Sequence, residues 1–301
     1  MRVEMDLRAS DADVSGIVVE WFVTAAEGIF SPLLRSLQNG PELCIPKKGE
    51  GVLGPPGGIW ASLTEQDLLQ GRVRVRKAWS EKNWSNFLGR VAKRPADSEF
   101  WILELRESGR RYGASQAKVS VQSVSEDGEW HRLRLEYGVG EPGAHSCHRV
   151  ISSLDVDSAV EYLRRAALRV PITFGCVTDD GGHGGETMLE DRLGLSPLKG
   201  IQESQDVLRG YPWVTVCSAH IADRLGGVAR LRESGAFTEV EELPTGSVWL
   251  RATDRLDDYA GEALRSVFRV VAPALPPGRP RPYVGCEIGR LVYEDWVVDT
   301  Y

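Results

Sequence analysis

The order of strand-like and helix-like segments constrains this chain more than any other sequence feature. Short apolar or alternating runs and amphipathic helical runs follow one another as strand–helix–strand–strand–strand–helix–strand, then strand–helix–strand–strand–helix. Because hairpins interrupt any steady βαβ alternation, the order excludes a doubly wound nucleotide-binding sheet. It predicts an α+β fold, with antiparallel or mixed sheets covered by helices.

The first half, residues 1–150, contains one unit with clear local signals. Arg72–Trp79 alternates as a half-buried strand does, and Ser80 is a predicted helix N-cap. Further strands are predicted at Gly16–Thr24, Ser98–Glu107, Lys118–Val124 and His131–Tyr137. A helix is predicted at Phe30–Gln38, and the Pro- and Gly-rich run 39–58 is predicted to be a loop.

The second half, residues 151–301, is predicted to be a second α+β half, fused to the first or part of the same domain. Its predicted helices are Asp155–Arg169, a short one within Glu186–Leu195, one capped by Ser218 and ended by Gly235, and Asp257–Val271. Its predicted strands are Pro171–Thr178, Pro212–Cys217, and a hairpin of Thr238–Leu243 with Ser247–Ala252.

Charge and hydropathy exclude two classes of protein. The 301 residues carry a net charge of −7, which is unlike the basic footprint of a nucleic-acid binder. Basic and aromatic residues interleave at Arg72–Trp84, but acids surround them, so a nucleic-acid platform is not favoured. No apolar stretch approaches the 18 residues of a membrane span.

Cysteine usage predicts a reducing, cytoplasmic location. The five cysteines are widely spaced, without a CxxC motif, and no signal-peptide pattern precedes them. Cys176 and Cys217 lie in apolar strand-like runs, where a buried thiol is the usual outcome.

The most unusual local composition follows the predicted strand Pro171–Thr178. Four glycines separate three acids and one histidine, a set that fits metal binding or proton transfer in a metal-assisted hydrolase: Asp179, Asp180, His183 and Glu186. The alternative is a solvated turn, in which glycines supply positive φ. The spacing matches no known metal motif, and this alternative is favoured.

Two other groups could carry chemistry. His145, Cys147 and His148 are ligands that suit zinc, but no second pair lies at finger-like spacing, so neither a metal nor a cofactor is expected. Cys217 with His220, at a strand-to-helix turn, could form a nucleophile pair, as could Cys176 with His183. Buried, inert thiols remain the preferred interpretation.

A pattern of packing residues runs from Gly210 to Pro276. It contains Tyr211-x-Trp213-Val-Thr-Val, Leu225-Gly-Gly, Gly235-Ala-Phe and Gly246-Ser-Val-Trp-Leu-Arg-Ala-Thr. This pattern resembles the C-terminal part of bacterial polymorphic-toxin and type VI immunity proteins. The resemblance implies a cytoplasmic, non-enzymatic protein that binds and blocks a cognate toxin, and it carries no contact residue over to this chain.

Three functions follow as hypotheses. The first is an immunity-type inhibitor that occludes a protein partner, for which the acidic balance favours a basic partner. The second is the metal-assisted hydrolase of the Asp179–Glu186 loop. The third is a structural subunit of a larger assembly, suggested by nine tryptophans and an apolar tail from Tyr283 to Tyr301.

Overall fold

The computed structural model describes residues 1–9, 13–45, 52–67, 72–95, 97–105, 115–124, 129–139, 156–180, 187–281 and 290–292. The chain divides into two compact units, one of Met1 with Asp13–Tyr162 and one of Arg2–Ala12 with Leu163–Tyr301. Among the described residues each unit has five β-strands, and every strand pairing within a unit is antiparallel. The predicted α+β class, with antiparallel sheets and helices, is confirmed.

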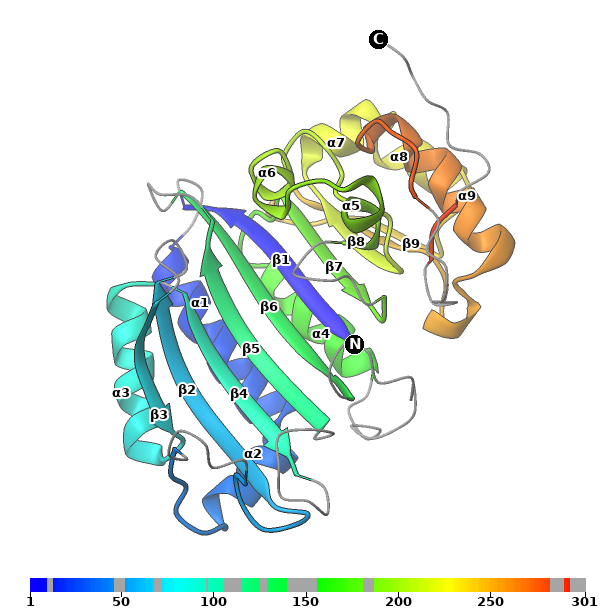
Figure 1. The fold of residues 1–301 in the computed structure, drawn as a ribbon. Helices are drawn as coiled ribbons and strands as arrows, with labels where there is room; N and C mark the ends of the chain where they lie inside the picture. Colours follow the sequence, from blue (N-terminus) through cyan, green and yellow to red (C-terminus); the bar gives the residue numbers. More distant parts are fainter. Residues whose placement is uncertain are drawn as a thin grey trace. The chain divides into compact units, whose positions relative to one another are not determined.

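The first unit is a sheet in the order β3-β2-β4-β5-β6, with helices on one face (Figure 1). Its strands are β2 (Ile59–Asp67), β3 (Arg72–Ala78), β4 (Ser98–Glu104), β5 (Ser115–Ser123) and β6 (Trp130–Val139). Its helices are α1 (Val14–Thr24), the π-helix η2 (Ala25–Ile29), α2 (Ser31–Gln38) and α3 (Glu81–Lys93). The boundary of the unit falls within α4 (Val156–Ala167).

Aromatic rings fill the space between α1, α3 and the first sheet. Phe22 of α1 meets Phe87 of α3 edge to face, with ring centroids 5.1 Å apart, and Trp84 lies 4.9 Å from Phe100 of β4. Alternation along β5 places its buried alanine and valines on this face and polar side chains, such as Lys118, on the other. The helical face therefore holds the core of this unit.

Part of the opposite face is covered by the Pro- and Gly-rich loop. Leu43 and Leu53 pack against Trp60 and Leu103, and the Trp60 indole N–H donates to the Cys44 carbonyl at 3.1 Å. The loop's irregular backbone, where described, agrees with its composition, and its leucines give that backbone a fixed place on the sheet.

The second unit is a sheet in the order β1-β7-β8-β10-β9. Its strands are β1 (Arg2–Arg8), β7 (Phe174–Thr178), β8 (Val214–Cys217), β9 (Glu239–Glu242) and β10 (Val248–Arg251). Its helices are α5 (Met188–Leu193), α6 (Pro197–Gln202), α7 (Ala219–Arg224), α8 (Gly227–Glu233), α9 (Gly261–Val271) and the 3-10 turns η3 (Leu256–Asp258) and η4 (Ala272–Ala274). Every residue of β7 and β8 is buried, so these strands form its centre.

The predicted strand Gly16–Thr24 is wrong, because this segment is the helix α1. The Asp13 side chain accepts from the Gly16 amide at 3.2 Å and caps the helix. Its buried residues recur at helical spacing: Val14, Val18, Trp21 and Phe22. A short apolar run is ambiguous between strand and helix, and here the cap and the packing against α3 decide.

The structure also has two strands that were not predicted, and it divides one predicted helix into two. β1 and β2 were not predicted, although β2 lies between β3 and β4. The helix that Ser218 caps is split into α7 and α8 by Gly226 and Gly227, whose φ angles are 97° and 82°. Side chains other than glycine rarely adopt such angles, so the pair permits a sharp change of direction.

Among the described residues, no single helix is long and apolar enough to span a membrane. The segments Val14–Ile29 and Ser31–Gln38 reach the required length only together, across an 84° bend. Val18 and Phe22 of this pair are fully buried in the first unit, which accounts for their apolar character.

Candidate functional site

Two of the carboxylates that the sequence analysis singled out directly follow strand β7, and both lie beside Arg290. The Asp179 side chain is 35% exposed, whereas that of Asp180 is 7% exposed. The Arg290 guanidinium forms an ion pair with Asp179 and lies 3.6 Å from Asp180. The Arg290 backbone N–H also donates to Asp180 Oδ1 at 3.4 Å. One arginine therefore contacts both carboxylates that follow the strand.

Residues 290–292 are held against the second unit by further hydrogen bonds. Arg290 Nε donates to the Tyr259 carbonyl at 2.8 Å, and the Val292 amide donates to the Tyr211 hydroxyl at 2.9 Å. The Tyr259 hydroxyl donates to the Tyr211 carbonyl at 2.5 Å. Each contact joins segments far apart in the sequence, so Arg290 belongs to a cross-link between β7, η3 and the segment before β8.

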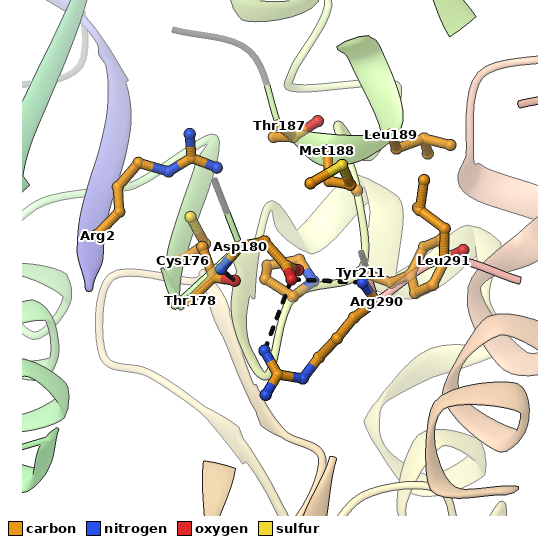
Figure 2. Close-up of a pocket in the computed structure, with 12 residues that line it drawn as sticks. Arg2, Cys176, Thr178, Asp180, Thr187, Met188, Leu189, Tyr211, Arg290 and Leu291 are labelled. Atoms are coloured by element: carbon orange, nitrogen blue, oxygen red, sulfur yellow. Dashed lines mark hydrogen bonds and ion pairs between the residues drawn. The ribbon is translucent and has the colours of Figure 1, made fainter. Parts of the chain in front are cut away.

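A small pocket opens at this cross-link (Figure 2). In the figure, Arg2 of β1 extends from one side, and Asp180 and Arg290 meet at the centre. The space has room for about one water molecule. Its walls are formed by Arg2, Cys176, Thr178, Asp180, Thr187, Met188, Leu189, Gly210, Tyr211, Pro212, Arg290 and Leu291.

Burial governs the titration of the groups around the pocket. Desolvation raises the pKa of Asp180, against hydrogen bonds from the Arg290 amide and Thr178 and the positive charge of Arg2. Desolvation also raises the pKa of Cys176 to about 12, so its thiol stays protonated at neutral pH. Burial therefore favours the protonated form of Asp180.

The geometry favours a structural use of Asp179 and Asp180. Both carboxylates face a cation, and a metal ion would have to compete with the Arg290 guanidinium for them. The described residues contain no group of three His, Cys, Asp or Glu side chains placed to hold a metal. His183 and Glu186 lie outside the described residues, as do His145, Cys147 and His148.

The structure separates the environments of Cys217 and His220. Cys217 is fully buried at the end of β8, and desolvation raises the pKa of its thiol to about 12. The His220 side chain is 57% exposed, with Nε2 3.4 Å from an Asp206 carboxylate oxygen. A protonated thiol in the core beside an outward imidazole favours the buried-thiol interpretation over a nucleophile pair.

The most deeply buried charges of the second unit lie around Arg209. Its guanidinium donates to Glu4 at 2.6 Å, to Asp6 at 2.5 Å and to both oxygens of Glu190 at 2.8 Å. All four side chains are 1% exposed or less. Burial lowers the pKa of Arg209, but the carboxylates of Asp6, Glu4 and Glu190 raise it well above its usual value.

Local structure fixes the cluster in place. Thr187 and Glu190 form a capping box at the start of α5, with the Thr187 hydroxyl accepting from the Glu190 amide at 3.2 Å. The same hydroxyl donates to the Arg209 carbonyl at 2.6 Å. Glu190 thus caps a helix and binds Arg209 with one carboxylate, which joins β1, α5 and the segment before β8.

The sequence analysis missed this cluster, although one signal was present. Arg2–Arg8 alternates charged residues with Val3, Met5 and Leu7, as a half-exposed strand does. In the structure the charged face is covered as well, since Glu4 and Asp6 are fully buried. The pattern identifies a strand, but only the cation from Arg209 explains why the acids are inside.

Comparison with known proteins gives a structural relative. The fold is similar to that of the T6SS protein PA0821 of Pseudomonas aeruginosa, with a TM-score of 0.51 and 10% sequence identity. The similarity covers 91% of this chain and 76% of that one. No protein-family model matches the sequence, and no curated protein matches it at a significant level. At this identity the similarity is one of fold.

Proposed function

We propose that this chain is an immunity-type protein of a type VI secretion system, which binds a cognate toxin and blocks it by occlusion. The observation that carries the proposal is the fold shared with a T6SS protein over 91% of the chain. The packing pattern from Gly210 to Pro276, which resembles type VI immunity proteins, supports the same class independently.

The chemistry of the second unit supports binding rather than catalysis. Asp179 and Asp180 are paired with Arg290, and the pocket beside them has room for about one water molecule. The buried thiols Cys176 and Cys217 have pKa values of about 12 and provide no thiolate. A protein that blocks a toxin by covering it needs none of these groups to be reactive.

A cytoplasmic location completes the proposal. An immunity protein that acts in the cytoplasm of the producing cell is in a reducing environment, where thiols stay free. Cys44, Cys176 and Cys217 are free thiols in the structure, and Cys44 is exposed, which agrees with that environment.

The test is protection against a toxin. Proteins encoded by genes adjacent to that of this chain are screened for one that arrests growth when expressed from an inducible promoter, and growth is then measured with and without this chain. Growth should be restored only when both proteins are present, and the two purified proteins should elute as one complex. As a control, a catalytically dead toxin should bind equally well. A toxin that still arrests growth and does not co-elute would contradict the proposal.

A further inference from the structure

The charges of this chain are strongly segregated. The segment from Arg72 to Arg94, which forms β3 and α3, has eight cationic side chains and one acidic one, a net charge of +7. Since the whole chain carries −7, the other residues carry −14. The cationic residues are Arg72, Arg74, Arg76, Lys77, Lys82, Arg90, Lys93 and Arg94. The acidic balance of the whole chain favours a basic partner, whereas this basic segment favours an anionic region within that partner.

The aromatic residues of this segment do not favour nucleic acid as the anionic partner. Trp79 is buried, at 6% exposure, and Trp84 stacks on Phe87 with ring centroids 5.8 Å apart. Trp84 also contacts Phe100 of the sheet. Single-stranded nucleic acid binds to exposed aromatic rings that stack on its bases, and these rings are used by the core. An acidic protein segment, which needs no stacking platform, therefore fits this surface better than a single strand of nucleic acid does.

β3 is an edge strand with exposed backbone and side chains. In the first unit it pairs with β2 and has no described strand on its other side (Figure 1). Arg74, Arg76 and Lys77 are exposed, and Val73 is 58% exposed. An exposed apolar residue among cations differs from a purely charged edge, whose role is to repel other strands.

The hydrogen-bond register shows which backbone groups face outward. The Trp79 amide donates to the Ala61 carbonyl at 3.0 Å, and Arg76 lies opposite Thr64. Because antiparallel pairs alternate between bonded and non-bonded, the N–H and C=O of Arg76 face away from β2. Its side chain lies on the sheet face that carries Trp60, 5.8 Å over that ring. Arg76 thus offers both a backbone donor and a positive charge at the edge.

We propose that β3 is a docking edge, along which an acidic, extended segment of the protein partner adds as a further antiparallel or parallel strand. Backbone hydrogen bonds to the outward groups of β3 supply affinity, and the cations of β3 select acidic side chains. Val73 offers the apolar contact of the added strand. This inference rests on the proposed function only for the identity of the partner as a toxin.

A short peptide of alternating Glu and Val tests the edge directly. Labelled peptide is titrated into the full-length protein by fluorescence anisotropy, beside a Lys–Val peptide and a thymine oligonucleotide of matched charge. The Glu–Val peptide should bind more tightly than both. At saturation, hydrogen exchange of the Arg76 amide should slow by about tenfold, as expected for a newly bonded N–H.

A matched pair of variants separates backbone pairing from charge. Arg76→Pro removes the outward N–H, which an edge strand tolerates, and Arg76→Gln removes the charge alone. Arg76→Pro should bind the peptide about tenfold more weakly than Arg76→Gln, as loss of a backbone hydrogen bond predicts. Circular dichroism checks folding, and if Arg76→Pro does not fold, hydrogen exchange on the unsubstituted protein decides.

Several outcomes would overturn the docking edge. They are equal binding of the two variants, binding of the Lys–Val peptide as tight as that of Glu–Val, or protection of Arg76 by the oligonucleotide and not by the peptide. A toxin complex that forms with Arg76→Pro as it does with Arg76→Gln also contradicts it and leaves the proposed function standing. Peptide binding without any toxin complex contradicts the proposed function alone.

Discussion

The Arg209 guanidinium lies 2.6 Å from the Glu4 carboxylate, although 205 positions separate the two residues in the sequence. Neither side chain is more than 1% exposed. The contact ties the first strand of the chain to the segment that leads into β8, so the second unit cannot form its sheet without bringing both ends of this pair together. Removing one partner leaves charge in a region that water does not reach.

Replacing Arg209 by Met should therefore destabilise the protein strongly. The variant leaves Glu4, Asp6 and Glu190 buried without their shared cation, and the expected loss of unfolding free energy is about 3–5 kcal/mol. Urea denaturation followed by circular dichroism measures it. Arg269→Met, at an exposed ion pair, is the control and should leave the midpoint nearly unchanged. An Arg209→Met midpoint equal to that of the control would contradict the prediction.

Substitution by alanine should have opposite effects on the unfolding free energy at two helical glycines. A methyl group on Gly200 would overlap the Glu190 carboxylate, which Arg209 holds in place, so Gly200→Ala should lose about 1–3 kcal/mol. Gly89 in α3 has open space around its Cα, so Gly89→Ala should gain about 0.5–1 kcal/mol from helix propensity. The unfolding free energies of both variants are compared with that of the parent. A Gly200→Ala variant as stable as the parent would show that the buried cluster is not rigid.

The cysteines should differ in reactivity. Cys44 is exposed, whereas Cys176 and Cys217 are fully buried with pKa values of about 12. At pH 8, iodoacetamide should modify Cys44 in the folded protein and reach the two buried thiols only after denaturation, because it reacts with the thiolate. Peptide mass mapping assigns each site. If Cys217 were labelled in the native state as fast as Cys44, the result would contradict its burial and support a nucleophilic role for Cys217.

Asp180 should make stability fall as pH rises through mild acid. Its pKa lies above the ordinary value of 3.8, so the folded protein keeps a proton that the unfolded chain has already lost. The unfolded state then binds fewer protons than the native state, and the unfolding free energy decreases with pH between the two pKa values.

The substitution Asp180→Asn isolates this effect, since the amide keeps the shape and does not titrate. The unfolding free energy of the parent minus that of the variant should decrease from about pH 4 upward, until the raised pKa is passed. Urea titrations at several pH values measure the difference. If the difference increased with pH, the attraction of Arg290 for the carboxylate would outweigh the cost of burial.

Local sequence patterns predicted most of the elements, and the exceptions have physical causes. The helix capped by Ser80 appears as α3, and the Ser80 hydroxyl accepts from the Asn83 amide at 3.2 Å. It could be predicted because both the cap and the apolar stripe depend only on residues close together in the sequence. The hairpin of β9 and β10 likewise depends on adjacent residues. The run from Gly16 to Thr24 carries no such unambiguous period, and packing of Phe22 against Phe87 decides for helix.

By itself, the sequence determined the α+β class, the positions of the strongly periodic elements and the burial of Cys176 and Cys217. These follow from interactions between residues a few positions apart, or from the apolar character of a single run. Only the tertiary structure decided that β1 pairs with β7, that Arg290 contacts both Asp179 and Asp180, and that Arg209 holds three buried carboxylates. Each of these depends on which distant charge is brought near, and a charged residue has the same local pattern whether its partner is water or an arginine two hundred positions away.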